Sequence, residues 1–186
     1  MTLFHGTNQV IKSIDLTKSR ARTDFGLGFY LSDKIGTAQD WAISKTMLLG
    51  GIPTVLQYDL SDDYKSIYGC RFPETPSDEW IAFVASNRQS AMRGGGTKEL
   101  RHDYNWVSGP IADDYMNTVV KEFISGNISK DEAIRRARVL PQTFQISLHT
   151  AEALGFIDEM NVTYKQLRNG KWSRKWVKRM PLLHIE

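Results

Sequence analysis

The sequence predicts a mixed α+β fold, because strand-like and helix-like patterns alternate along its 186 residues. Alternating apolar and polar residues over 54–60 and 142–149 are typical of half-buried strands. Apolar residues at helical spacing over 35–42, 77–84 and 113–123 predict amphipathic helices. No internal repeat is present, so we expect one main domain with a real hydrophobic core.

The segment 24–32 is the one around which we expect the fold to be organised. It follows a short predicted strand at 3–6 and a polar loop. Gly26 and Gly28 allow the chain to bend closely around a ligand, and the apolar and aromatic residues after them predict a short buried strand.

The helix that follows this strand is expected to be capped by Ser32 or Asp33 and to end at the two glycines 50–51. Its apolar face includes Trp41, which we therefore expect to lie near Tyr30. The bend and the two aromatic rings together predict a slot for a flat ring.

The later elements are marked by local signals. Ser129 and Glu132 match the capping box that starts a helix, and Asn169-Gly170 is typical of a tight hairpin turn. In chain order we expect a strand at 54–60, a helix from 77, a glycine-rich loop at 92–97, a strand at 106–111, helices from 113 and 129, a strand at 142–149 and a short helix from 150.

Charge is unevenly distributed. Residues 162–186 carry seven basic residues and one acid, whereas the residues before them are mildly acidic, and the net charge of the chain is +3. We therefore expect a domain over 1–160 and a basic C-terminal hairpin or tail over 161–186.

Cys70 is the only cysteine, so no disulfide within the chain is possible and a reducing compartment is favoured. No apolar run approaches the roughly 18 residues of a membrane span, and the N-terminal residues do not resemble a signal peptide. We expect a soluble, cytoplasmic protein that does not bind a membrane.

Several classes of site are disfavoured. Neither the Rossmann nor the P-loop glycine pattern occurs, and the histidines and the cysteine lack metal-ligand spacing, so no metal is expected. His5-Gly6-Thr7 places an imidazole and exposed backbone amides at a strand end, which alone is a weak signal. Together with the segment 24–32 and Gln145, it indicates polar strand ends around an aromatic slot.

These segments, in this order, resemble the motifs of ADP-ribosyltransferases of the diphtheria-toxin and poly(ADP-ribose) polymerase class. The similarity spans residues 3 to about 157 and is strongest to small bacterial proteins that look like toxins of toxin-antitoxin and phage-defence systems. It implies a split β-sheet core with helices, NAD as co-substrate, and transfer of ADP-ribose to RNA, DNA or protein, with an antitoxin as a further partner. The matching segments are His5-Gly6-Thr7, Gly26 to Tyr30, Ala38 to Trp41 and Gln145 to Leu148.

The resemblance also implies roles for single residues. His5 would bind the adenosine ribose and the Gly6 backbone the nicotinamide amide, while Tyr30 and Trp41 would hold the nicotinamide ring between them. His5, Tyr30 and Gln145 would form the catalytic set. The supporting cofactor-binding residues would be Thr7, Gly28 and Ser32.

Gln145 departs from the family pattern, in which active members usually carry glutamate. An amide accepts a hydroxyl hydrogen bond but cannot act as a base, and losing such a group typically costs about 10² to 10³ in rate. Asp113 or Asp114 could supply a carboxylate instead, although acids at a helix start more often serve the helix dipole.

Two alternatives stay open from the sequence. Tyr30 and Trp41 are also compatible with ordinary core aromatics, which leaves a catalytically inactive NAD- or ADP-ribose-binding module as the second hypothesis. The basic tail, in which Lys171, Arg174 and Lys175 are interleaved with tryptophans, suits nucleic-acid contact, a solvated face or docking of an acidic antitoxin.

Overall fold

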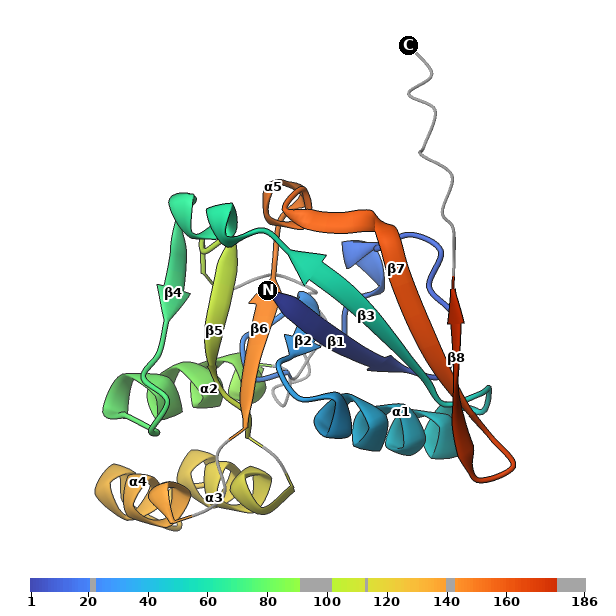
Figure 1. Cartoon of the computed structure of the whole chain (residues 1–186). Helices are drawn as coiled ribbons and strands as arrows, with labels where there is room; N and C mark the ends of the chain where they lie inside the picture. Colours follow the sequence, from blue (N-terminus) through green and yellow to red (C-terminus); the bar gives the residue numbers. More distant parts are fainter. Residues whose placement is uncertain (21–22, 91–101, 113, 140–142, 177–186) are drawn as a thin grey trace. The chain divides into compact units, whose positions relative to one another are not determined.

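The computed structural model describes residues 1–20, 23–90, 102–112, 114–139 and 143–176, and these form a mixed α+β structure in which most strand pairs are antiparallel (Figure 1). The expectation of a mixed α+β fold is thus confirmed. The chain divides into two compact units. Unit 1 contains residues 1–14, 31–67 and 151–186, and unit 2 contains residues 15–30 and 68–150.

Unit 1 is built on a sheet of antiparallel strands. β1 (Thr2–Thr7) pairs with β2 (Phe29–Ser32) and with β3 (Thr54–Leu60), β3 pairs with β7 (Ile157–Arg168), and β7 pairs with β8 (Lys171–Trp176). The boundary between the units falls within β2, between residues 30 and 31.

Helix α1 (Ile35–Leu49) covers this sheet through small residues. Ala38 and Ala42 are fully buried against Val55 of β3, and Trp172 of β8 packs on the same cluster. The helix begins at Ile35 after the cap residue Lys34, so the expectation of a Ser32 or Asp33 cap is wrong. The Ser32 hydroxyl instead accepts a hydrogen bond from the Lys34 N–H, 3.1 Å away, which forms a turn before the helix.

The hairpin between β7 and β8 turns at Asn169 and Gly170, which have φ values of 50° and 72°. These two positive values are those of the tight hairpin turn that an Asn-Gly pair favours. β7 begins at Ile157 and pairs with β3 from its first residue, so residue 160 lies within this strand. Unit 1 also contains the 3₁₀ helix η2 (Asp62–Ser66) and the short helix α5 (Ala151–Leu154).

Unit 2 contains a smaller sheet and three helices. β4 (Gly69–Arg71) is parallel to β5 (Trp106–Pro110), and β5 is antiparallel to β6 (Phe144–Leu148). The helices are α2 (Asp78–Ser90), α3 (Asp114–Ile124) and α4 (Lys130–Arg138), and η1 (Leu16–Lys18) is a short 3₁₀ turn.

The core of unit 2 is centred on Trp80 of α2, which is fully buried with Phe25, Ile81 and Met116. The Trp80 indole N–H donates to the backbone carbonyl of Pro110 at 3.1 Å, so the only polar atom of the ring is satisfied. Half of the predicted capping box is present at the start of α4: the Ser129 hydroxyl accepts from the Glu132 backbone N–H at 3.2 Å, whereas the Glu132 carboxylate accepts from Arg135 and Arg136. The predicted glycine-rich loop at 92–97 lies outside the described residues.

Candidate functional site

The segment Asp24 to Gly28 of unit 2 is held in one conformation by side chains from four places. Each of four consecutive backbone carbonyls accepts a hydrogen bond from a different side chain, over 2.6–3.2 Å. Such a segment loses little conformational freedom when a ligand binds. In chain order the donors are Asn87 to the carbonyl of Asp24, His102 to that of Phe25, Tyr30 to that of Gly26, and His149 to that of Leu27.

These bonds determine the protonation of the two histidines. A carbonyl only accepts, so Nε2 of His102 and Nδ1 of His149 must carry hydrogens. Nδ1 of His102 accepts from the Tyr104 backbone N–H at 3.3 Å, which makes this ring neutral. The two rings meet edge to face, with centroids 4.7 Å apart.

Burial lowers the pKa of both imidazoles, and it lowers that of His149 to about 4. Nε2 of His149 and the hydroxyl of Ser147 are among the buried polar atoms of the described residues that have no hydrogen-bond partner. Ser147 lies on the same face of β6 as Gln145, since alternate residues of a strand share a face, and His149 follows directly after the strand.

Gly28 lies directly against this face. A Cβ atom at position 28 would come within 2.3 Å of the Ser147 hydroxyl and 2.7 Å of Nδ1 of His149. The segment therefore approaches β6 so closely that only a hydrogen atom fits between them. The sequence predicts that the chain bends closely around a ligand at this glycine, whereas the structure places the protein's own residues Ser147 and His149 against it.

The Asp24 side chain is almost fully buried and receives four hydrogen bonds. Its Oδ1 accepts from Nε and Nη2 of Arg88, and its Oδ2 accepts from the Ala112 backbone N–H at 2.9 Å and from Nε2 of Gln145 at 2.8 Å. The side chains of Asp24 and Arg88 are only 7% and 15% exposed, so this is a buried ion pair. Asp24 thus connects its segment to α2, to Ala112 after the end of β5, and to β6.

Gln145 is buried, at 1% exposure, and its amide nitrogen is committed to Asp24. The carboxylate beside Gln145 is therefore Asp24, which sequence reasoning missed. Asp113 lies outside the described residues, as does the side chain of Asp114. The separation of 121 residues between Asp24 and Gln145 explains the omission, because neither residue has a local pattern that points to the other.

Tyr30 also contacts the segment. Its hydroxyl donates to the Gly26 carbonyl at 2.7 Å and accepts from the Phe25 N–H at 3.0 Å. Its ring stacks on that of Phe25 with centroids 6.3 Å apart, and burial raises the pKa of the Tyr30 hydroxyl. The hydroxyl therefore stays protonated at physiological pH and acts as a neutral hydrogen-bonding group.

In unit 1, the predicted first motif lies on β1, where His5, Gly6 and Thr7 pair with β3. A Cβ atom on Gly6 would come within 2.1 Å of the Ala38 backbone carbonyl, so β1 and α1 touch at this glycine. The hydroxyl of Thr7 is 3.4 Å from Nζ of Lys45 on α1.

The residues that the sequence assigned to NAD are thus found in both units. Unit 2 brings Gly28, Tyr30 and Gln145 together around the segment at 24–28. Tyr30 and Trp41 belong to different units, and their pairing around a flat ring stays a prediction. Unit 1 carries His5, Gly6, Thr7, Ser32 and the half-buried Trp41.

The three basic residues predicted to contact nucleic acid lie on β8. The Lys171 side chain is exposed, next to the hairpin turn and opposite the exposed Arg168 of β7. The side chains of Arg174 and Lys175 lie outside the described part of the chain, although their backbones pair with Lys165 and Tyr164.

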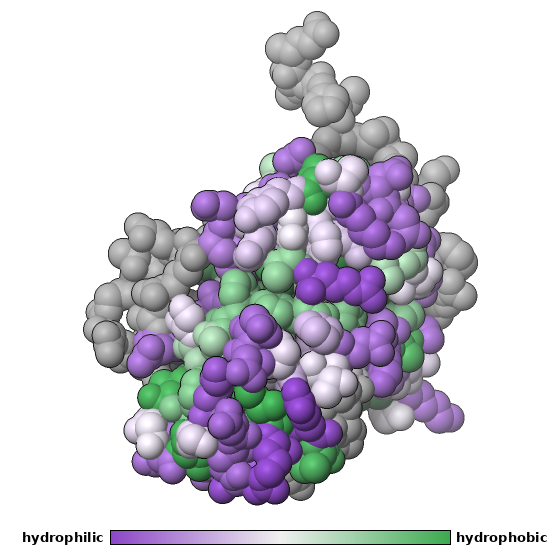
Figure 2. Space-filling view, turned by 90° about the vertical axis from the view of Figure 1, so that its left-hand side faces the viewer, coloured by the Kyte–Doolittle hydropathy of each residue, from purple (hydrophilic) through white to green (hydrophobic). Residues whose placement is uncertain are grey.

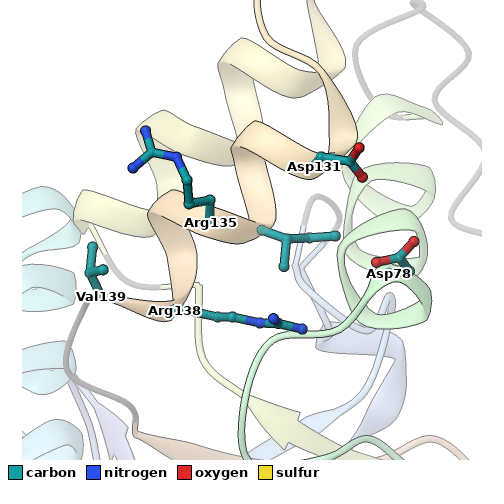
Figure 3. A pocket seen from close by; sticks show the side chains of 6 residues that line it. Asp78, Asp131, Arg135, Arg138 and Val139 are labelled. Carbon is teal, nitrogen blue, oxygen red and sulfur yellow. The ribbon is translucent and has the colours of Figure 1, made fainter.

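A surface depression of about 440 Å³ lies between α4 and the start of α2, and it contains none of the predicted site residues (Figure 3). Asp78 forms an ion pair with Lys130 at 2.6 Å, and Arg135 pairs with Glu132 at 2.7 Å. In Figure 2 charged and polar residues are interspersed with several separate apolar areas, rather than arranged around one apolar patch. The depression therefore fits an ordinary solvated surface.

None of the helices in the described ranges has both the length and the apolar composition needed to cross a bilayer. Residues 1–158 match the model of a family that is described as protein of unknown function, DUF3990. No curated protein and no solved structure gives a significant match to the chain.

Proposed function

Since the chain belongs to the DUF3990 family, whose description assigns no function, we propose its activity from its own residues: it is an NAD-dependent ADP-ribosyltransferase. The bond between nicotinamide and its ribose breaks, nicotinamide leaves, and the acceptor forms a new bond to the same ribose carbon while losing a proton. The transition state resembles the oxocarbenium ion of glycoside cleavage.

The observation that carries this proposal is the contact between two motifs that the resemblance assigns to one site. The Gly26–Tyr30 motif meets the motif that starts at Gln145 in unit 2, where Gly28 lies against Ser147. The Gln145–Asp24 bond of 2.8 Å and the His149–Leu27 bond of 2.6 Å connect each motif to a residue that flanks the other. This juxtaposition supports a binding role for the segment.

A second pair of motifs supports the proposal within unit 1. Gly6 touches the backbone of α1 at Ala38, three residues before Trp41 on the same helix. A side chain at position 6 would separate strand and helix, which explains why glycine is needed after His5.

The proposed roles follow the resemblance. His5 binds the adenosine ribose, the Gly6 backbone binds the nicotinamide amide, Tyr30 and Trp41 stack on the nicotinamide ring, and Gln145 accepts a hydrogen bond from the nicotinamide ribose. Because Gln145 offers no negative charge and no base, the proposed acceptor is one that is already nucleophilic, such as a base amine or a guanidinium. Thr7, Gly28 and Ser32 support these groups.

We further propose that the acceptor is a nucleic acid, with RNA favoured over DNA and protein, and that the protein is the cytoplasmic toxin of a toxin-antitoxin or phage-defence system. The cations of the β7–β8 hairpin support phosphate contact, and Arg168 and Lys171 stand opposite each other at its turn. An antitoxin would be the natural partner of such an enzyme.

One observation favours the second candidate function, a catalytically inactive module that binds NAD or ADP-ribose. The Gln145 side chain is buried and its amide nitrogen is already bound to Asp24. Under this alternative the protein acts by binding a partner, and NAD binds without release of nicotinamide.

The test is incubation of the full chain with NAD labelled in its adenylate phosphate and separate pools of RNA, DNA and lysate protein. Transfer of label that is abolished by His5→Ala and by Tyr30→Ala, but kept by the exposed Tyr68→Ala control, supports the transferase. NAD binding without label transfer and without nicotinamide release supports the inactive module. Absence of NAD binding refutes both.

A further inference from the structure

Four hydrogen-bond donors meet at the Asp24 carboxylate, and this determines which side chain is possible there. Nε and Nη2 of Arg88 point at Oδ1, while the Ala112 N–H and Nε2 of Gln145 point at Oδ2. An amide at position 24 would turn an N–H toward one pair of these donors. Only an ionised carboxylate accepts from all four.

The hydrogen bonds at the Asp24 carboxylate also determine which residue is possible at position 145. Oδ2 of Asp24 has no hydrogen to donate, so its partner 2.8 Å away must be a donor. Glutamine meets this condition, whereas an ionised glutamate would place two negative oxygens in contact within a buried site. In the planar amide of Gln145, fixing Nε2 on Asp24 turns Oε1 to the opposite side of the group.

We infer that Asp24 is a positioning residue for Gln145: its carboxylate holds the amide nitrogen, makes Gln145 present its carbonyl oxygen as an acceptor, and excludes an anionic glutamate. The part of this inference that concerns the reaction rests on the proposed function, in which that oxygen accepts from the ribose of NAD. Glutamine is then the residue that matches Asp24, not the remnant of a lost catalytic glutamate.

The pH dependence of a Gln145→Glu variant tests this. The titratable and charged groups that the structure describes around the pair are Arg88 on α2, Tyr30, and His102 and His149 on the adjoining carbonyls. Arginine stays charged, and the raised pKa of Tyr30 and the pKa of about 4 for His149 keep both groups neutral between pH 5 and 8. His102 is present in variant and wild type alike, so comparison with the wild type removes its contribution.

In the variant, the new carboxyl group faces Asp24, so its pKa in the folded protein rises above the unfolded value of about 4.3. Below that value the group is protonated in both states and its O–H donates to Asp24. As the pH rises toward the folded pKa, the unfolded state releases the proton first and stability falls. Relative to wild type, the melting temperature should therefore drop between pH 5 and 8, by roughly 3–5 °C for each unit of pKa elevation.

The matched control is Gln166→Glu on β7. Gln166 is also buried, at 7% exposure, but its amide nitrogen donates to the Thr54 hydroxyl at 3.2 Å and not to a carboxylate. The stability lost in Gln166→Glu should depend less on pH, because burial alone raises the pKa of its new carboxyl group. In an Asp24→Asn background, the pH dependence caused by Gln145→Glu should become much smaller, because burial remains but the neighbouring negative charge is gone. Equal losses at pH 5 and 8 for Gln145→Glu, or an undiminished pH dependence in the double variant, would overturn the inference.

Nicotinamide release supplies a readout that a purely structural role would not change. If Gln145 acts as an oriented neutral acceptor, only the protonated form of the Gln145→Glu variant mimics it. Its rate relative to wild type should fall with rising pH, by about tenfold per unit above the pKa of the new group. A rate that rises with pH would refute the inference, since an anionic glutamate would then be the better catalyst. If the wild type releases no nicotinamide at any pH, the proposed function fails, and the melting data still decide whether Asp24 positions Gln145.

Discussion

Replacing His149 with asparagine is expected to change how stability depends on pH. His149 is 8% exposed, donates from Nδ1 to the Leu27 carbonyl at 2.6 Å, and has a pKa lowered to about 4 by burial. An asparagine amide nitrogen can take the place of Nδ1, so the variant keeps the donor and removes only the titration.

The size of this effect follows from the difference between the His149 pKa in the folded protein and in the unfolded chain. The unfolded chain binds a proton at His149 near pH 6.5, whereas the folded protein does so only near pH 4. The stability contributed by the neutral, buried ring is therefore complete above pH 6.5 and is lost as the pH falls toward 4. At 1.36 kcal/mol per pKa unit, the wild type should lose about 3 kcal/mol more than the variant over this range, or roughly 6–12 °C in melting temperature.

Urea unfolding followed by tryptophan fluorescence at pH 7, 6, 5 and 4 measures this difference directly, because the carboxylates that titrate below pH 5 are common to both proteins. The two stability curves should separate progressively below pH 6.5. Parallel curves would refute the reasoning, since they would mean that His149 takes up its proton in the folded state as readily as in the unfolded chain.

Three further substitutions test the packing around the site, each by thermal unfolding. Gly28→Ala should lower the free energy of unfolding by about 1–3 kcal/mol and weaken NAD binding, because its methyl group would overlap the Ser147 hydroxyl. If stability and NAD binding are both unchanged, the segment at 24–28 does not lie against β6. Asp24→Ala should cost about 3–5 kcal/mol by leaving Arg88 buried without a counter-charge, and a loss below 1 kcal/mol would contradict that burial. Gly36→Ala is the opposite control: no atom lies within 4 Å of its added methyl group in the first turn of α1, so it should stabilise by up to about 1 kcal/mol.

Local patterns predicted the elements well where the signal lies within a few residues. The N-cap at Ser129 and the turn at Asn169-Gly170 depend on neighbours in sequence, and both are present as expected. The strand predicted from the alternation over 142–149 is also present as β6, but it is buried on both faces and is not the half-buried strand that the pattern predicts. The cap of α1 was predicted wrongly, because a serine or aspartate before a helix is equally suited to a preceding turn, which is what Ser32 forms.

The candidate site was only partly accessible from the sequence. Gly28, Tyr30 and Gln145 were identified through motifs, whereas the contacts that organise them in unit 2 come from Asp24, Arg88 and two histidines spread over more than 120 residues. No repeating sequence pattern marks the residues of a buried ion pair or a buried neutral histidine. Only the folded chain shows that they converge on one segment.

The two units are built from interleaved segments of the chain, and this determines which unit is completed first during synthesis. Every residue of unit 2 has been made once the ribosome passes residue 150, but unit 1 still lacks β7, whose partner β3 was translated about 100 residues earlier, and β8, which pairs with β7. Domains tend to fold as their residues emerge, and contacts distant in sequence form late. The half that carries His5 and Trp41 therefore completes its sheet only after unit 2 has been synthesised.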